Sequence, residues 1–512
     1  MHSEAPKDKP SKAGGGHKVV TGFSWLMIAR LAVMALSFIS TAILARILTP
    51  ADFGVMAAAW LVLALTNAVF EGSFGIGVVQ RAEIDDNYIS TTLYMSLILA
   101  IAMFAIVAVA APLVEHFFRF PHLGAILTVT AVTLIFKAGG SVSQALLQRR
   151  RQFAALAIIN IGTYALGFCI VSTVMALKGY GVWSLVGGAV VGGVTEAVAS
   201  LIVARVPIRV RPDRESMRHV VKTSGFFTIS QVLAWAANAG ANAVIGRSLG
   251  AIPLGIYSRG WKLLDVAVSA TAAPMHKVLL PAFARLQNDQ EAARRALLKS
   301  LSLAAPLFGM VSIFVVLHAH AIVMIALGPK WGDTVIVVQL LFSALIPRCA
   351  YKISESLAVG FGRSGAAVVR QGLYAVLMVG GSIIGAMHGP TGVAVAVSIA
   401  IWIFYGISLS YAAHLADLRL LALVGLHARS LALGLPVILA DLIVMRLLAP
   451  VNFWVSELGG GAAGGLVLLA LAVLSPDSWL GSELANVRRG VRSRLLALKQ
   501  RFGARRVANS VG

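Results

Sequence analysis

The chain has 512 residues, of which 58% are hydrophobic and only 12% are charged, and its mean hydropathy is +0.84. Soluble domains carry about 25% charged residues, so this composition excludes a soluble enzyme and predicts an integral membrane protein. The formal net charge of +22 would suit nucleic-acid binding, but the positions of the basic residues indicate membrane orientation instead.

The first 19 residues are polar, rich in glycine and basic, which predicts a disordered cytoplasmic tail. The apolar run that follows is too long for the hydrophobic region of a signal peptide, and no small-residue cleavage site ends it at the usual length. We therefore expect an uncleaved first transmembrane helix.

Fourteen segments are long and apolar enough to cross a bilayer, which takes about 20 mostly apolar residues. They predict an all-α polytopic membrane protein with about 14 transmembrane helices. The stretch from His318 to Gly328 is itself apolar and could extend the ninth or the tenth segment, so totals of twelve or thirteen stay open. The predicted spans are 20–46, 53–78, 89–114, 122–147, 154–177, 181–203, 224–248, 253–281, 298–320, 333–357, 365–387, 391–414, 430–449 and 459–475.

The basic residues between the spans alternate with the side of the membrane. With the N-terminus in the cytoplasm, 29 Lys and Arg residues fall on the inner side and six on the outer side. This is the bias that the positive-inside rule describes, and it predicts that both termini are cytoplasmic. The largest loop has about 20 residues, which leaves no room for an extramembrane catalytic domain. We therefore expect a protein that is not an enzyme.

The tail 480–512 is strongly basic. Its segment Val487–Arg506 could form a basic amphipathic helix on the anionic inner leaflet. A disordered polybasic tail is the equal alternative.

Two segments separated by 201 positions resemble each other, namely Ala42–Trp60 and Ala243–Trp261. Both cross from one predicted span into the next, and six spans separate them, so they predict parallel repeats related by an axis along the membrane normal. The repeat implies an N-lobe at 20–203, a cytoplasmic linker at 204–223, a C-lobe at 224–414 and two further spans within 430–475. The identical pairs are Ala42/Ala243, Arg46/Arg247, Leu48/Leu249, Gly54/Gly255 and Trp60/Trp261.

Charged residues inside the spans are the main chemical signal. The spans hold eight Lys and Arg but five Asp and Glu residues, and buried charges need partners. An excess of three positive charges indicates an anionic ligand. Arg30 lies about ten residues into its span, roughly 15 Å deep at 1.5 Å per residue, where it cannot easily reach the interface; Lys137 is comparably deep.

Other intramembrane cations have simpler explanations beside the functional one. Lys262 and Lys352 each have an acid three residues later, Asp265 and Glu355, which is the spacing of a helical ion pair. Arg259 lies near an outer span end, where its side chain could extend to the interface. The residues predicted to bind a diphosphate or other anion are Arg30, Lys137, Lys262, Arg348, Lys352 and Arg259.

A structural alternative pairs these cations with Glu71, Glu196 and Asp441. Asp265 and Glu355 are also candidates for proton or sodium coupling, although ion pairing explains each of them as well. Cys169 and Cys349 lie in separate apolar runs, and His116, His276, His318 and His320 show no metal-ligand spacing. We therefore predict no cofactor, no metal and no catalytic residue.

Several segments carry a family resemblance. The chain resembles the Wzx-type polysaccharide flippases, in their exopolysaccharide branch, of the multidrug/oligosaccharidyl-lipid/polysaccharide exporter superfamily. The segments are GFSWLMIARLAVMALSFISTAILARILTPADFGVMA, QRAEIDDNYISTTL, QRRRQFAALA and LGPKWGDTV.

This resemblance implies two six-helix lobes around a central cavity and alternating access. It also implies that an undecaprenyl-diphosphate-linked oligosaccharide moves across the bacterial inner membrane for exopolysaccharide synthesis, with a polysaccharide polymerase and chain-length proteins as partners. In related lipid-diphosphate flippases, arginines of the first and eighth helices matter. Arg30 has the first position here, and Arg259 and Lys262 are the candidates in the eighth.

Three other functions fit the sequence less well. An ion-coupled drug antiporter of the same superfamily would favour an acidic cavity rather than a basic one. A membrane polymerase or ligase would need a large outer loop with catalytic residues. A scaffold membrane protein would leave deep charges without a purpose.

Overall fold

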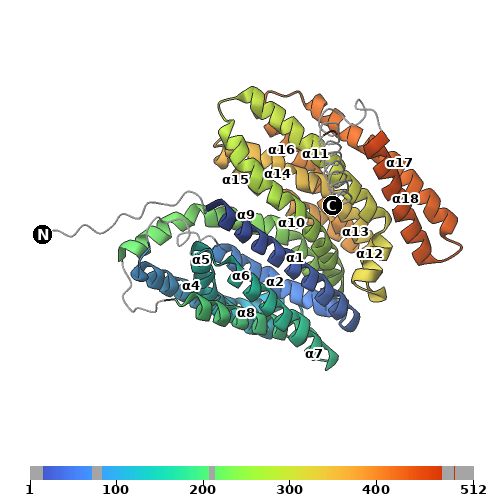
Figure 1. Cartoon of the computed structure of the whole chain (residues 1–512). Helices are drawn as coiled ribbons and strands as arrows, with labels where there is room; N and C mark the ends of the chain where they lie inside the picture. Colours follow the sequence, from blue (N-terminus) through green and yellow to red (C-terminus); the bar gives the residue numbers. More distant parts are fainter. Residues whose placement is uncertain (1–14, 72–83, 207–213, 475–488, 490–512) are drawn as a thin grey trace, which may run out of the picture. The chain divides into compact units, whose positions relative to one another are not determined.

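The computed structural model describes residues 15–71, 84–206, 214–474 and 489, and every regular element in these ranges is a helix (Figure 1). Thirteen helices of the described part are long and apolar enough to cross a membrane. The predicted all-α polytopic fold is confirmed. The seventh predicted span corresponds to a helix, α9, that is not among these thirteen.

Some predictions fall outside the described residues. They concern the first 14 residues of the N-terminal tail, most of the C-terminal tail with its amphipathic segment, and part of the linker 204–223. Helix α1 begins at Gly15, before the predicted start of the first span.

The chain forms two compact units. Unit 1 contains Met1–Ser258 and the short segment Ile325–Trp331, whereas unit 2 contains Arg259–Met324 and Gly332–Gly512. The boundary between them lies inside a helix, α10, and not in the linker 204–223. The division into an N-lobe and a C-lobe remains a prediction.

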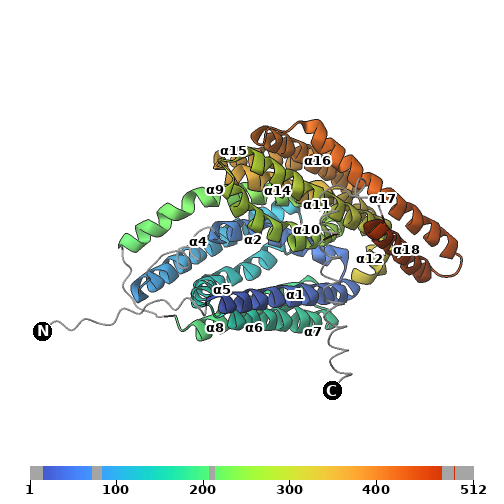
Figure 2. The ribbon, with the colours of Figure 1, turned by 45° about the horizontal axis from the view of Figure 1, so that its top comes forward.

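Unit 1 is built from long apolar helices and one π-helical segment. Helices α1 and α6 run side by side (Figure 2), and α8 packs on α5 and α6. The elements are α1 (Gly15–Ile47), α2 (Pro50–Glu71), α4 (Asp86–Phe118), α5 (Leu123–Arg149), α6 (Phe153–Tyr164), the π-helix η1 (Ala165–Val171), α7 (Ser172–Leu177), α8 (Val182–Ala204), α9 (Arg214–Leu249) and the first turns of α10 (Ala251–Arg285).

Unit 2 begins with the rest of α10. Helices α17 and α18 form an antiparallel hairpin (Figure 2), and α17 also packs on α11. Ile325–Trp331, which holds the 3-10 helix η2 (Pro329–Trp331), interrupts this unit. The elements are α11 (Gln290–Leu317), α12 (Ala319–Ala326), α13 (Thr334–Ser343), α14 (Leu345–Gly360), α15 (Ser364–Ala386), α16 (Gly389–Leu415), α17 (Leu420–Leu448) and α18 (Phe453–Leu474).

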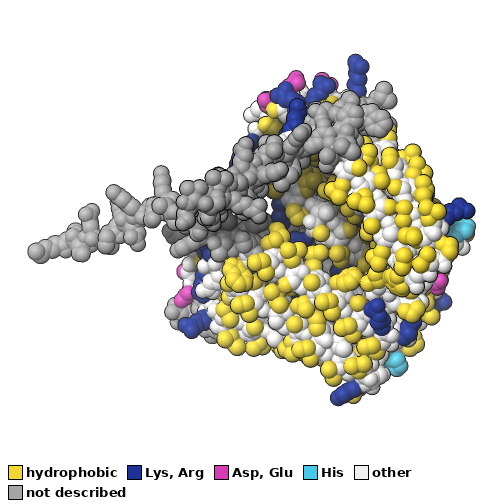
Figure 3. All heavy atoms as spheres, turned by 45° about the vertical axis from the view of Figure 1, so that its right-hand side comes forward, with side chains coloured by type: hydrophobic (Ala, Val, Ile, Leu, Met, Phe, Trp, Pro, Cys, Tyr) yellow, Lys and Arg dark blue, Asp and Glu magenta, His cyan; other side chains and the backbone are white. Residues whose placement is uncertain are grey.

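Large apolar side chains cover much of the surface, as the bilayer requires of lipid-facing helices. On α4, for example, Val109 and Leu113 are 78% and 72% exposed. Figure 3 shows a face on which hydrophobic side chains predominate. The exposure of these side chains agrees with an integral membrane protein.

The corner between α1 and α2 is built by local hydrogen bonds. Pro50 starts α2, where its missing N–H costs nothing. The Thr49 and Asp52 residues cap each other, because the Thr49 backbone N–H donates to Asp52 Oδ2 at 2.9 Å and the Asp52 N–H donates to Thr49 Oγ1 at 3.3 Å. This is a capping box with an aspartate in the third position, and it makes the turn sharp.

Helix corners of the two repeat segments pack on each other in a reciprocal way. A Cβ added to Gly54 would lie 1.9 Å from the carbonyl oxygen of Ala251, and one added to Gly255 would lie 1.9 Å from that of Pro50. Gly54 and Gly255 are equivalent in the repeat, and so are Pro50 and Ala251. Such mutual contacts are what a two-fold relation between copies produces.

Each corner also contacts a further segment of unit 1. Next to the first corner, the indole N–H of Trp331 donates to the Ala45 carbonyl at 3.0 Å, and Arg46 donates to the Ile325 carbonyl at 2.8 Å. Next to the second, the Arg247 guanidinium lies 5.6 Å from the ring centroid of Phe117. Arg46 and Arg247 are thus structural residues of the two repeats.

We predict that Gly54→Ala and Gly255→Ala each destabilise the protein by about 1–3 kcal/mol or more, because the new methyl group would overlap backbone that cannot move aside. The measurement is thermal unfolding of the purified protein in detergent. Gly380→Ala in α15 is the control, since a Cβ there meets nothing within 4 Å. Equal stability of all three variants would contradict the proposed close approach.

Candidate functional site

A cavity of about 990 Å³ lies within unit 1. Its wall is formed by α1, α2, α5, α6, η1 and α8. The volume is in the range of small-molecule sites. Both deep cations of the first unit, Arg30 and Lys137, line it, so the structure brings together the two residues that the depth argument selected.

Lys137 is held in place by a neutral partner. Its ammonium donates to Asn67 Oδ1 at 2.8 Å, from α5 to α2. Because the amide carries no net charge, this bond orients the ammonium without cancelling its charge. Arg30 and Lys137 both remain exposed at the cavity, so a ligand can reach them.

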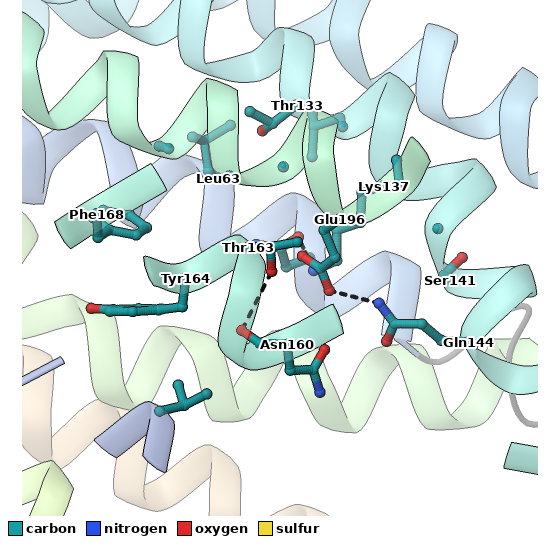
Figure 4. A pocket seen from close by; sticks show the side chains of 18 of the residues that line it. Leu63, Thr133, Lys137, Ser141, Gln144, Asn160, Thr163, Tyr164, Phe168 and Glu196 are labelled. Carbon is teal, nitrogen blue, oxygen red and sulfur yellow. Dashed lines mark hydrogen bonds between the residues drawn. The ribbon is translucent and has the colours of Figure 1, made fainter. Parts of the chain in front are cut away.

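Among the described residues that line the cavity, Glu196 is the one acid. Its carboxylate accepts a hydrogen bond of 2.6 Å from the Gln144 amide, and Figure 4 shows the two side chains pointing toward one another. The predicted alternative paired Glu196 with an intramembrane cation, whereas the hydrogen bond here comes from an amide. With two basic residues and one acid, the wall has a formal charge of +1.

The opposite wall includes the π-helix η1. Tyr164 and Phe168 stack at 5.1 Å between ring centroids and face the cavity (Figure 4). The π-helix is close to α8, because a Cβ on Gly167 would lie 2.6 Å from the Gly188 carbonyl. π-Helical turns occur often at functional sites, and here the junction of α6, which ends at Tyr164, with η1, which holds Phe168, places two aromatic rings at the cavity.

Arg348 does not contribute to an open site. It is 8% exposed and lies on α14, where its Nη1 donates to Tyr374 Oη at 2.9 Å. Its guanidinium also lies 5.4 Å from the Trp261 ring centroid and 5.8 Å from that of Tyr351. Cation–π contacts of this kind stabilise a desolvated guanidinium, so the aromatic residues surround a charge that was predicted to meet the ligand.

Lys352 and Glu355 form the predicted ion pair, with 2.9 Å between Nζ and Oε2. The ammonium also lies 4.8 Å from the Tyr351 ring. One turn away, His276 and Ser356 are hydrogen-bonded at 2.7 Å. The charge of Lys352 is balanced locally by Glu355, and these residues belong to unit 2.

For Lys262, Asp265 and Arg259, the structure does not show the contacts that the sequence suggested. Both Lys262 and Asp265 are exposed and, although both are described, no ion pair joins them. Arg259 is 7% exposed instead of extending to the interface. At this level α10 is tightly packed on α13, because a Cβ on Gly260 would lie 2.9 Å from the Val337 side chain.

Sequence reasoning missed the uncharged polar residues of the cavity. Asn67, Asn160 and Thr163 all line it. A signal was present in α5, where polar residues recur at helical spacing and share one face. These are Thr130, Thr133, Lys137, Ser141 and Gln144.

Comparisons with known proteins agree on one family. The model of a family described as "Polysaccharide biosynthesis protein" matches residues 43–336. The lipopolysaccharide biosynthesis protein WzxC of Escherichia coli is 23% identical over 63% of this chain and 66% of its own length. The succinoglycan biosynthesis transport protein ExoT of Rhizobium meliloti is 23% identical over 61% of this chain and 63% of its own length. The matches thus span somewhat less than two thirds of these relatives.

Solved structures show the same fold at low identity. The lipid II flippase MurJ, in an inward closed conformation, has a TM-score of 0.70 at 16% identity and covers 88% of this chain and 98% of its own. An inward-facing multidrug resistance MATE family transporter of the MOP superfamily has a TM-score of 0.63 at 17% identity, with 76% and 98% coverage. The family model and the relatives WzxC and ExoT confirm the resemblance to Wzx-type flippases predicted from sequence motifs, and the solved structures show the same fold.

The position of Lys137 can be tested by labelling. In a chain with Cys169→Ser and Cys349→Ser, a cysteine at Lys137 should react readily with a negatively charged methanethiosulfonate reagent, because the cavity is open to water. Ala138→Cys is the matched control, since Ala138 is 0% exposed. Arg30→Gln should slow labelling at position 137 roughly threefold, because it removes a positive charge that attracts the anionic reagent through a screened interaction. Equal reactivity at both positions would contradict this placement.

Proposed function

The chain belongs to the polysaccharide biosynthesis protein family, and we propose that it is a flippase for a lipid-linked oligosaccharide. The substrate is an oligosaccharide joined through a diphosphate to undecaprenol. It moves from the inner to the outer leaflet of the bacterial inner membrane, for synthesis of an extracellular polysaccharide. The termini of the chain face the cytoplasm.

The observation that carries this proposal is the cavity of unit 1. It exposes the side chains of Arg30 and Lys137 together, within walls that are otherwise apolar or uncharged except for Glu196. A diphosphate offers several strong acceptor oxygens, and charge-assisted hydrogen bonds to them are about twice as strong as neutral ones. The low dielectric of a membrane protein interior strengthens the attraction further.

The other lining residues suit a saccharide. The amides of Asn67, Gln144 and Asn160 can donate to and accept from hydroxyl groups. Trp60 and Tyr164 present aromatic faces to the same space, and such rings combine an apolar body with a polar edge. A site of this kind binds the head group of the lipid and leaves the prenyl chain to the surrounding bilayer.

Alternating access is the mechanism we propose for the transfer. Two compact units are the parts that rigid-body rocking requires. Proton or sodium coupling through Asp265 or Glu355 belongs to the same proposal. Glu355 already shares an ion pair with Lys352, so protonation of its carboxylate would release that cation.

We predict that Arg30→Gln and Lys137→Gln each weaken binding of purified undecaprenyl-diphosphate oligosaccharide by at least about tenfold, since a hydrogen bond to a charged group contributes about 1.5–3 kcal/mol and about 1.4 kcal/mol corresponds to a factor of ten. Glu196→Gln should strengthen binding, because it removes the negative charge of the wall. The measurement is equilibrium binding of the labelled lipid to protein in nanodiscs, with polymer export by cells as a second readout.

Lys178→Gln is the matched control, because Lys178 is an exposed basic residue that does not line the cavity. Raising the salt concentration should weaken binding by the wild type more than by a variant that carries both Arg30→Gln and Lys137→Gln. Unchanged binding by both single variants would contradict the anion site. Preferential binding of a cationic dye would favour the drug-antiporter alternative, which the positive wall disfavours.

A further inference from the structure

Three titratable side chains meet inside unit 2. His318 follows the last residue of α11, whereas Asp441 lies in α17 and Glu457 in α18. They are 4%, 2% and 8% exposed. The imidazole bridges the two carboxylates, with 2.5 Å from Nδ1 to Glu457 Oε2 and 3.0 Å from Nε2 to Asp441 Oδ2.

The two short distances determine how many protons the cluster holds. A neutral imidazole has one N–H and one lone pair, so it can donate to only one of two carboxylates. Both hydrogen bonds therefore require a second bridging proton, either on the ring or on a carboxyl group. In either case the three residues together carry a charge of −1, and loss of the second proton would place a lone pair against an anion and raise the buried charge to −2.

Neighbouring helices enclose the cluster tightly, and in the described part of the chain no Lys or Arg forms an ion pair with it. A Cβ on Gly460 would lie 2.3 Å from Asp441 Oδ1, and one on Gly461 would lie 3.5 Å from His318 Nε2, so α18 comes close to both residues. The ring of Phe314 covers the imidazole at 4.7 Å between centroids. Asp441 Oδ1 is buried without a hydrogen-bond partner in the described part of the chain.

The other titratable groups on the elements packed here lie outside the cluster. His320 is exposed and its ring contacts Phe453 at 5.1 Å between centroids. Arg446 of α17 is exposed as well. Among the described residues, the ion pairs of Asp441 and Glu457 are both with His318.

We propose that His318, Asp441 and Glu457 form a proton-binding site that fastens the α17–α18 hairpin to the end of α11. With two bridging protons, the imidazole joins both helices of the hairpin. When one proton leaves, repulsion loosens the hairpin. The docked state holds one proton more than the loosened one, so docking is favoured at low pH and is lost as the pH rises.

Amide hydrogen exchange of the full-length protein in nanodiscs tests this, with rates corrected for the intrinsic effect of pH. Between about pH 5.5 and 9.5, exchange at the turn between α17 and α18 and in the first turns of α18 should become at least roughly tenfold faster in the wild type. Exchange that does not change over this range would overturn the proposal.

Asp441→Asn is the decisive variant. A neutral imidazole can donate to Glu457 and accept from the new amide, so both hydrogen bonds form at the same charge of −1 without a dissociable second proton. Hairpin exchange in this variant should stay slow at high pH. The same pH dependence as in the wild type would overturn the proposal. His318→Leu should show fast exchange at all pH values, because its side chain can neither donate to nor accept from the two carboxyl groups.

His427→Gln is the matched control. His427 also joins two helices, through a 2.7 Å hydrogen bond between its Nε2 and Tyr405 Oη, but no carboxylate takes part. Its pH dependence should equal that of the wild type. Loss of the pH dependence in this variant as well would assign the effect to general loosening of α17 and overturn the site.

Discussion

The close backbone approach at Gly54 and Gly255 is the constraint on which unit 1 depends. A methyl group at either position would overlap a carbonyl oxygen, so only glycine lets the two helix corners meet. The first corner directs both α1 and α2 inward, and these helices supply Arg30 and Asn67 to the cavity wall. Residues that bind nothing themselves thus determine where the cationic residues lie.

Much of the fold could be predicted because hydropathy and period are local properties of the chain. The all-α architecture and nearly all spans follow from apolar length, and the repeat pointed to the Gly54/Gly255 pair before its geometry was known. Arg30 and Lys137 were found because depth in a span is readable from sequence. That the two residues share one cavity could be seen only from the packing of α1 on α6 and of α8 on α5 and α6.

The rest of the site depends on contacts between distant residues. The sequence could not reveal the contacts of Arg348, because its aromatic neighbours Trp261 and Tyr374 come from other helices. The cluster at His318 was missed for the same reason, since its two acids are 123 and 139 positions away. Sequence spacing within one helix reveals an ion pair such as Lys352–Glu355, whereas partners across helices need the structure.

The charges within the helices therefore differ in how each is stabilised, and this difference separates structure from function. Arg348 is surrounded by aromatic rings, Lys352 is paired with Glu355, and His318 is bridged by two carboxylates. Each of these side chains already has its contacts within the protein and has little left for a substrate. In the described part of the chain, the hydrogen bond of Lys137 is to a neutral amide, and its side chain remains exposed to a cavity. An anion that enters the cavity would offset the energetic cost of placing this charge within the membrane.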